Sequence, residues 1–415
     1  MTTEPLLPVA AAERVETIDI LRGMALFGIL AANMRGFAGP PLTYFWPNLI
    51  WPGLLDRIAQ AIIDTFVQGK FIAIFAVLFG AGFAVQLERA ASRGGRFGWI
   101  YARRLAILLL FGLIHGLLIW FGDILLTYAL IGFFLLLFRK RTDKTLVVWI
   151  VIGLAIPVLL MTAIYLAVTF GADVPMPVPT ATEIAKVRDI YASGTWVEIL
   201  MQRMSDAVRY NWAYFLVGMW QIGALFLFGV LAWRKRFFQP APESLPLYRR
   251  AMWWGLTIGA AGNAFATILR WALDLPLMPT TTGSFAAIFV QTIANPALSL
   301  GYICAVILLC HDDVWRRRLQ RFGAVGRTAL TNYLLQSVIG TLLFYSYGLA
   351  LFGYIGPAAL LPLTFAIFAV QVVLSVWWLE RFRFGPVEWL WRSLTYGRRL
   401  PLTRERAVAP DVLPT

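Results

Sequence analysis

The sequence RKRTDKTLVVWIVIGLAIPVLLMTAIYLAVTF, residues 139–170, joins a basic cluster to a long apolar run. A helix needs about 20 mostly apolar residues to cross the hydrocarbon core of a bilayer. Residues 146–170 meet that length without a single charged side chain. They therefore predict a membrane-spanning helix that begins beside a basic loop.

The composition of the whole chain indicates the same class. Of 415 residues, 60% are hydrophobic and 14% are charged, and the mean hydropathy is +0.71. A soluble domain carries about 25% charged residues, because it needs them to solvate its surface. The net charge of +14 does not indicate a nucleic-acid partner, since the basic residues form short clusters between apolar runs rather than one polar face.

Similar apolar runs recur along the chain, and we expect an all-α, polytopic integral membrane protein with about ten transmembrane helices. The predicted spans are 18–38, 60–87, 104–121, 124–138, 146–170, 211–233, 251–272, 284–310, 329–351 and 358–380. In this scheme residues 1–17 form an N-terminal segment, 18–380 a transmembrane bundle, and 381–415 a C-terminal tail.

The connections between spans predict the orientation, because cytoplasmic loops are enriched in lysine and arginine. With the N-terminus in the cytoplasm, the basic clusters fall in the cytoplasmic connections and the tail. Both termini are then cytoplasmic. The segment 171–210 is expected to lie outside, as an extended stretch at 174–179 followed by a mixed-charge helix from about 182 to 209 that caps the outer face.

The sequence shows no pattern typical of a disulfide, a metal site or a nucleotide-binding loop. Cys304 and Cys310 lie six residues apart in one predicted span, so we expect no disulfide between them. The sequence holds no metal-ligand cluster, P-loop or dinucleotide fingerprint, and we expect no metal. Gly255 and Gly259 are interpreted as a helix-contact motif.

Polar side chains at bilayer depth are costly and are therefore functional candidates. In the first span, Asp19 and Arg22 have the i, i+3 spacing of an ion pair on one helix face. Asn33 follows Arg22 by eleven residues, close to three turns, which places it on that face about 16 Å further along. Interfacial snorkelling of Arg22 and a helix-packing hydrogen bond of Asn33 are the structural alternative.

A second polar cluster lies in residues 112–128, GLIHGLLIWFGDILLTY. His115 is in the middle of a predicted span, and imidazole is the side chain best matched to proton transfer near neutral pH. Asp123 has no nearby cation in the sequence to explain it. The alternative is a packed, hydrogen-bonded histidine beside Gly112 and Gly116.

Other buried polar candidates are found in later spans. Asp64, Gln68 and Lys70 are expected near the outer start of the second span, where they would line an opening, and interfacial snorkelling explains Lys70 equally well. The remaining candidates are Asn263, Arg270, Asn332, Tyr333 and Gln336.

Four segments, 18–33, 112–128, 326–333 and 382–392, resemble the YeiB-like family, a bacterial membrane family catalogued as a domain of unknown function. That family is similar to a wider superfamily of transmembrane acyltransferases, which includes bacterial O-acyltransferases and the lysosomal heparan glucosaminide N-acetyltransferase. The resemblance implies transfer of an acyl group from cytosolic acyl-CoA to an acceptor across the membrane. It also implies location in the bacterial inner membrane.

The O-acyltransferases carry an arginine, ten residues and then a catalytic histidine in the first span. Here Arg22 matches the arginine, and Asn33 stands in place of the histidine. The lysosomal enzyme resembles this chain in having asparagine at that place, with a histidine further on. Residues 34–60 hold no histidine, which leaves His115 as the intramembrane substitute.

The leading hypothesis is therefore a membrane acyltransferase that uses acyl-CoA, with acetyl-CoA the favoured donor. His115 would act as general base on an acceptor hydroxyl or amine, oriented by Asp123 or another carboxylate, with Asp19 or Asp123 as the substitute base. Asn33 would donate to the developing oxyanion. Arg22, Arg327 and Arg383 would bind phosphate or the pantetheine arm.

Two other functions fit the same residues. A transporter would use Asp19, Arg22, His115 and Asp123 as a proton or substrate pathway. A catalytically inert scaffold would bind lipid or partner proteins. The expected partners are membrane lipids, acyl-CoA and an unidentified acceptor, and the sequence leaves a monomer and a homodimer both open.

Overall fold

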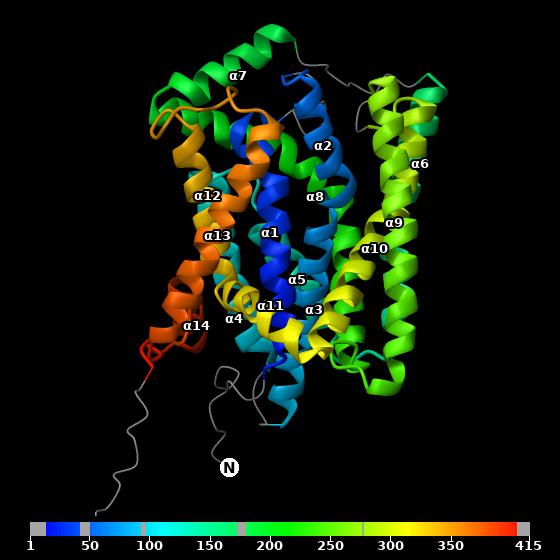
Figure 1. Cartoon of the computed structure of the whole chain (residues 1–415), viewed down its shortest axis with the longest axis vertical. Helices are drawn as coiled ribbons and strands as arrows, with labels where there is room; N and C mark the ends of the chain where they lie inside the picture. The colour runs from blue at the N-terminus through cyan, green and yellow to red at the C-terminus, as the bar shows by residue number, and fades with distance from the viewer. Residues whose placement is uncertain (1–13, 42–49, 93–96, 172–179, 276–277, 405–415) are drawn as a thin grey trace, which may run out of the picture.

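The computed structural model describes residues 14–41, 50–92, 97–171, 180–275 and 278–404, and these form a bundle of helices (Figure 1). The helices are α1 (Glu16–Ala38), α2 (Leu54–Phe66), α3 (Lys70–Ser92), α4 (Phe97–Ile114), η3 (His115–Ile119), α5 (Leu125–Phe138), α6 (Asp143–Thr169), α7 (Ala181–Ser193), α8 (Trp196–Arg234), η4 (Pro242–Ser244), α9 (Leu245–Leu273), α10 (Thr282–His311), α11 (Asp313–Arg327), α12 (Ala329–Phe344), α13 (Pro357–Arg381) and α14 (Pro386–Tyr396). The described residues contain no strand beyond an isolated bridge between Phe382 and Thr403. The all-helical class is confirmed.

Six helical stretches in the described ranges are long and apolar enough to cross a membrane. They are Glu16–Ala38, Leu54–Ala91, Phe97–Ile119, Asp143–Thr169, Thr282–His311 and Pro357–Arg381. The apolar helices α5 and α12 are shorter. The chain is therefore a multi-pass helical membrane protein, while the count of about ten spans stays a prediction.

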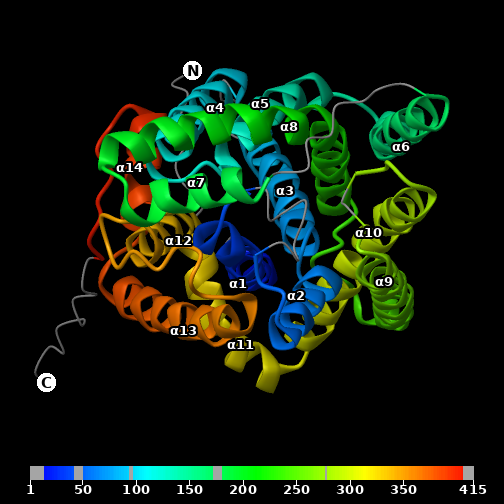
Figure 2. The same ribbon diagram turned by 90° about the horizontal axis from the view of Figure 1, so that it is seen from above.

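Helix α1 runs through the centre of the bundle, as the view from above shows (Figure 2). It is packed against α3, α11, α12 and α13. Its closest neighbour is α11, because Gly23 and Gly326 let the two backbones touch. A Cβ on Gly326 would overlap the carbonyl oxygen of Asp19. This contact brings the end of α11, with Arg327, beside the start of α1.

The predicted second span, 60–87, is interrupted. Helix α2 ends at Phe66 and α3 begins at Lys70, and between them Gly69 has a φ of +83°. A positive φ of this size is readily adopted by glycine and strained for other residues. The apolar pattern continues across the interruption, so hydropathy alone did not show it.

The interpretation of 171–210 as one outer cap is corrected in its second half. Helix α7 lies across one end of the bundle, as expected of a cap (Figure 1). The expected helix 182–209 instead stops at Ser193, and α8 begins at Trp196 and runs on without a break through the predicted span 211–233. Both helices start with a capping box, Thr180 with Glu183 and Thr195 with Glu198. The predicted extended stretch at 174–179 lies outside the described residues.

Two further predictions concern single helices. The ninth span was expected at 329–351, but α12 ends at Phe344 and residues 345–356 form turns. The motif at Gly255 and Gly259 is confirmed as a helix contact, because a Cβ on Gly255 would lie 2.7 Å from the nitrogen of Gly301 on α10. Cys304 and Cys310 are free and buried, as predicted.

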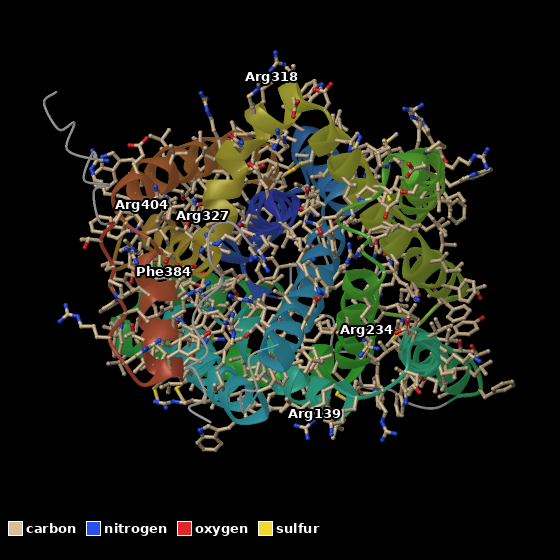
Figure 3. All side chains as sticks on the ribbon, turned by 90° about the horizontal axis from the view of Figure 1, so that it is seen from below. Arg139, Arg234, Arg318, Arg327, Phe384 and Arg404 are labelled. Carbon is tan, nitrogen blue, oxygen red and sulfur yellow. The ribbon has the colours of Figure 1, made fainter. Side chains whose placement is uncertain are left out.

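The basic residues of several connections lie at one end of the bundle. In the view from below, Arg139, Arg234, Arg318, Arg327 and Arg404 are spread over this face (Figure 3). Helix α7 lies at the opposite end (Figure 1). The molecule thus has one arginine-rich face.

Candidate functional site

A cavity of about 260 Å³ opens among α1, α3, α4, α11, α12 and α14, and we call it the arginine cavity. Seven half-buried arginines line it: Arg14, Arg22, Arg89, Arg104, Arg327, Arg383 and Arg392. They come from distant parts of the sequence and are gathered by the packing of α1 on α11 and of α14 on α4. Such a concentration of guanidinium groups is an anion-binding arrangement.

Two carboxylates line the same cavity, and both are already engaged. Asp19 accepts a hydrogen bond from Arg22 over 3.0 Å. Glu388 accepts from the backbone N–H of Leu330 at 2.6 Å and of Thr331 at 3.0 Å, at the start of α12. The cavity therefore carries more positive charge than its own carboxylates offset.

The electrostatics of α14, which lies outside the membrane-spanning stretches, show the effect of this crowding. Burial raises the pKa of Glu388. Burial and the neighbouring Arg104 and Arg14 lower the pKa of Arg392 to about 10. Burial likewise lowers the pKa of Arg327 at the end of α11. Bound negative charge would relieve both the desolvation and the mutual repulsion of these arginines.

The inner end of the arginine cavity is apolar. Leu26, Ile29, Phe79 and Leu125 line it, with the rings of Tyr128 and Tyr333. A ligand with an anionic head and an uncharged arm matches this gradient from charged mouth to apolar end.

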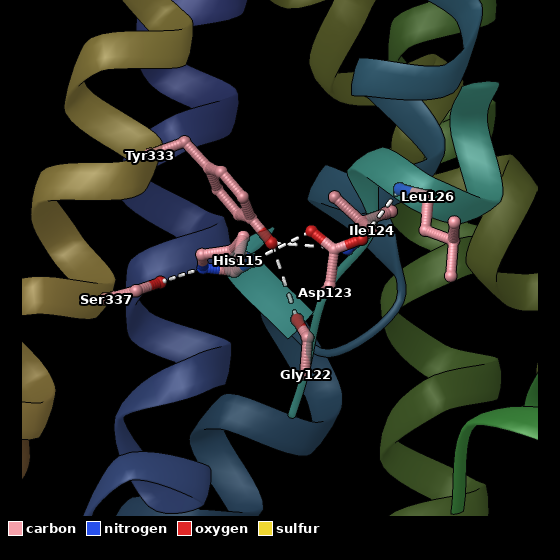
Figure 4. Close-up of polar contacts among 7 residues, drawn as sticks. All are labelled: His115, Gly122, Asp123, Ile124, Leu126, Tyr333 and Ser337. Atoms are coloured by element: carbon pink, nitrogen blue, oxygen red, sulfur yellow. Dashed lines mark hydrogen bonds and ion pairs between the residues drawn. The ribbon is translucent and has the colours of Figure 1, made fainter. Parts of the chain in front are cut away.

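A chain of buried polar side chains adjoins this inner end (Figure 4). The Nδ1 atom of His115 lies 2.8 Å from Oδ1 of Asp123, and its Nε2 atom lies 2.8 Å from Oγ of Ser337. The side chain of His115 is 0% exposed and that of Asp123 is 2% exposed. We call Asp123, His115 and Ser337 the relay.

Local backbone geometry positions the relay. Helix α4 passes into one π-helical turn that begins at His115, and such turns are frequent at functional sites. Asp123 precedes α5 and accepts the backbone N–H of Leu126 over 2.6 Å, which satisfies a donor in the first turn of that helix. Gly112 makes this possible, because a Cβ there would lie 3.0 Å from Oδ2 of Asp123.

For a neutral imidazole, the hydrogen-bond partners favour one tautomer of His115. A carboxylate accepts, so Nδ1 donates its hydrogen to Asp123. Nε2 is then the acceptor, and the hydroxyl of Ser337 donates to it. A hydroxyl, an imidazole and a carboxylate in this order form the arrangement that activates a serine for acyl transfer.

Tyr333 separates the relay from the arginine cavity. Its ring lines the cavity and lies 5.1 Å, between centroids, from the imidazole of His115. Its hydroxyl accepts the N–H of Ile124 over 3.3 Å and donates to the carbonyl of Gly122 over 3.4 Å. Near the imidazole, Trp120 packs on Phe37, with ring centroids 4.2 Å apart.

The structure brings together most of the residues singled out in the sequence. Arg22, Asp19, Arg327 and Arg383 share the arginine cavity. His115 and Asp123 are paired beside it. Asn33 is half-buried on α1 and is not among the described residues that line the cavity.

Ser337 is a candidate site residue that the sequence reasoning missed. It lies 222 residues from His115, so no local pattern joins the two. A signal was present on its own helix, since Tyr333, Gln336 and Ser337 are spaced to share one face of an apolar segment. Arg104 and Arg392 were missed because basic residues near a helix end also fit simple snorkelling.

The fold and these motifs define a multi-pass membrane protein of the YeiB-like type, and the family model described as "Protein of unknown function (DUF418)" matches residues 232–398. The matched part holds Arg327, Tyr333, Ser337 and Glu388, while Arg22, His115 and Asp123 precede it.

Relatives cover nearly the whole chain. It is 37% identical to the uncharacterised protein YxaH of Bacillus subtilis (strain 168), over 97% of this chain and 99% of that protein. It is 35% identical to the uncharacterised protein YeiB of Escherichia coli (strain K12), over 92% of this chain and 96% of that protein. An uncharacterised 39.9 kDa protein of Bacillus acidopullulyticus is 29% identical over 95% of this chain. The chain belongs to the YeiB-like, DUF418 family.

Proposed function

We propose that this protein is a membrane acyltransferase that takes an acyl group from acyl-CoA and transfers it to an acceptor hydroxyl or amine. The observation that carries the proposal is the hydrogen-bonded relay of Ser337, His115 and Asp123 next to the arginine cavity. The phosphates of CoA suit the arginines at the mouth, and the uncharged pantetheine arm suits the apolar inner end. Acetyl-CoA is the favoured donor.

The relay assigns the first acyl acceptor. Because Oγ of Ser337 lies 2.8 Å from Nε2 of His115, it is the hydroxyl that a neutral His115 is placed to deprotonate. The Ser337 oxygen attacks the thioester carbonyl carbon, a new C–O bond forms, and the C–S bond breaks. His115 takes the serine proton and gives it to the departing sulfur, so that CoA leaves as a thiol.

The second step returns the site to its starting state. The acceptor oxygen or nitrogen attacks the ester carbonyl on Ser337 while His115 removes the acceptor proton. The C–O bond to Ser337 breaks, and that proton passes to the serine oxygen. Asp123 keeps the imidazole in the required tautomer and stabilises its charged form. The proposal uses no oxyanion donation by Asn33, because no contact of Asn33 with the cavity or the relay supports it.

Tyr333 must move for the thioester to meet Ser337. The two residues are four apart on α12, which corresponds to about 6 Å along the helix. Rotation of one ring would therefore join the inner end of the cavity to the relay.

The proposed membrane arrangement has about ten spans, with both termini and the arginine cavity on the cytoplasmic side of the bacterial inner membrane. The enrichment of cytoplasmic loops in basic residues supports it, since the labelled arginines share one face (Figure 3). Cytosolic acyl-CoA would then enter from the side where it is made.

The test uses purified protein in detergent with acetyl-CoA as the probe. Calorimetry should show binding that weakens as salt screens the arginines. A thiol reagent should then detect release of CoA. The proposal would be overturned if the protein showed no binding of acetyl-CoA at low salt and no release of CoA.

One observation favours a second candidate function, transport. Helices α2 and α3 together form a stretch long and apolar enough to cross a membrane, yet it is interrupted at Gly69, and interrupted helices line the substrate sites of many transporters. Uptake of a solute into proteoliposomes without acyl-CoA would support transport. Acyl transfer is the better-supported function, because a proton pathway would use His115 and Asp123 but gives no role to the hydroxyl of Ser337 on Nε2 of His115.

A further inference from the structure

A second cavity, of about 270 Å³, lies where the interruption between α2 and α3 meets α8, α9 and α10. We call it the amide cavity, because four amide side chains line it: Gln68, Gln221, Gln291 and Asn295. Asp64 and Arg270 are the charged residues of its lining. Helix α9 begins shortly after Arg234, which lies on the arginine-rich face (Figure 3), and Arg270 is in its last turn. This cavity therefore lies toward the opposite end of the bundle from the arginine-rich face.

The backbone beside this cavity is interrupted between α2 and α3, and on the facing side α10 holds a proline. Gln68 and Gly69 belong to the interruption, and Pro296 sits inside α10. Irregular backbone at membrane depth is tolerated where it is buried in protein or lines a polar cavity. The amide of Asn295 packs over this point, since a Cβ on Gly69 would lie 3.1 Å from its Nδ2 atom.

Within the described part of the chain, three buried polar atoms of the cavity lining have no hydrogen-bond partner. They are Oε1 of Gln68, Oδ1 of Asn295 and Nε of Arg270. The other side of Arg270 is occupied, because its Nη1 donates to Gln291 over 2.6 Å. Buried polar atoms of native proteins are almost always satisfied, so three of them around one space indicate a partner that fills it.

The lining restricts the chemistry of that partner. The described lining holds one carboxylate, Asp64, and one guanidinium, Arg270, and so has no net charge of its own, which favours a neutral molecule over an ion of either sign. The unpaired atoms include acceptors and a donor, and a hydroxyl both donates and accepts. No aromatic ring is among the described residues that line the cavity, so it offers no stacking surface for a planar ligand.

We propose that the amide cavity is a binding site for a small, neutral, polyhydroxylated molecule. Gln68 and Asn295 accept hydrogen bonds from its hydroxyl groups, and Arg270 donates to one of its oxygens. The site is independent of the proposed acyl transfer, because none of its residues belongs to the relay or the arginine cavity.

The cavity offers variants that separate binding from folding. Neither the side chain of Gln68 nor that of Asn295 hydrogen-bonds another residue in the described ranges. Gln68→Leu and Asn295→Leu therefore remove no protein hydrogen bond, and replacing an unsatisfied buried group by an apolar one is neutral or stabilising. Gln86→Leu is the control for position, because Gln86 lines the arginine cavity instead, where its Nε2 donates to the carbonyl of Gly82 over 2.9 Å.

The experiment is saturation-transfer NMR on the full-length protein in detergent, with sorbitol and D-glucose as probes and acetate and choline as charged controls. We expect transfer to a polyol and none to the ions. The signal should fall severalfold in Gln68→Leu and Asn295→Leu, with size-exclusion profiles unchanged, and persist in Gln86→Leu. Transfer to neither polyol, equal signals in all variants, or preference for an ion would overturn the proposal. No acyl donor is present, so a negative result leaves the acyltransferase proposal untouched.

Discussion

The arginine cavity and the amide cavity have almost the same volume, about 260 and about 270 Å³, but opposite electrostatic character. Seven arginines face two engaged carboxylates in the first, whereas one carboxylate and one arginine share the second with four amides. Volume therefore says little about the ligand of either site. The polar groups that each lining leaves uncompensated indicate an anion for one and a neutral, hydroxyl-rich molecule for the other.

The two cavities are close neighbours. Tyr128 lines the arginine cavity, and its hydroxyl donates to the carbonyl oxygen of Ile72, which lines the amide cavity, over 2.9 Å. The relay adjoins the arginine cavity alone, through Tyr333. Substitutions in the relay and the arginine cavity should therefore change CoA release and acetyl-CoA binding, whereas substitutions in the amide cavity should leave both unchanged.

The largest effect is expected at the relay. His115→Ala and Ser337→Ala should each lower the rate of CoA release by about a thousandfold, because one variant lacks the general base and the other lacks the nucleophile of the first step. The double variant should be no slower than either single variant, since the residues act as a unit. Affinity for acetyl-CoA, measured by calorimetry, should stay within about twofold, because these groups act in the transition state. Ser337→Ala protein with the wild-type rate would remove the serine from the pathway.

Asp123→Asn should have the next largest effect. An amide nitrogen at Oδ1 would donate to Nδ1 and force the opposite tautomer, leaving Nε2 unable to accept the serine hydrogen. We expect a loss of CoA release of about a hundredfold or more. The contact with Leu126 N–H should keep α5 folded, which circular dichroism and size-exclusion chromatography can check. A folded variant with normal turnover would show that Asp123 only packs against His115.

A smaller effect is expected at the mouth of the arginine cavity. Arg327→Gln should weaken acetyl-CoA binding roughly tenfold at low salt, because it removes a charge-assisted hydrogen bond. Arg318→Gln is the control, since Arg318 is exposed on the same helix and does not line the cavity. Equal effects of the two substitutions would mean that the whole basic face, rather than the cavity, attracts the ligand.

The smallest effect is expected in the amide cavity. Gln68→Leu should leave the melting temperature unchanged or slightly raised, because its side-chain oxygen is buried without a partner. CoA release should be unaffected. A marked loss of thermal stability would show that Gln68 holds the interruption between α2 and α3 together, and would weaken the assignment of the cavity to a ligand.

The sequence predicted the helical membrane class because apolar length is a local property. It also placed His115 and Asp123 in one short segment, and the structure pairs them through the turn that His115 begins. Ser337 could not be predicted in the same way, since tertiary packing of α12 brings it to the imidazole. The same holds for Arg104 and Arg392, which join Arg22 only when α14 packs on α4.

Two errors had signals in the sequence. The capping box of Thr195 and Glu198, directly after Gly194, marks the start of α8 within a segment that was interpreted as one helix. Gly69 marks the interruption after α2, but hydropathy averages over single glycines. Both errors concern the ends of helices. There the backbone conformation of one or two residues decides where a helix stops, whereas hydropathy reports only the average composition of the segment.

The most direct test of the proposed relay is to look for an acyl group on Ser337. Purified protein is incubated with acetyl-CoA without an added acceptor, quenched in acid and digested, and the peptide that contains Ser337 is examined by mass spectrometry. The account predicts an acetyl ester on Ser337, formed together with an equal amount of free CoA, and absent from His115→Ala. Release of CoA by the wild-type protein with Ser337 unmodified, together with undiminished release by Ser337→Ala, would contradict it.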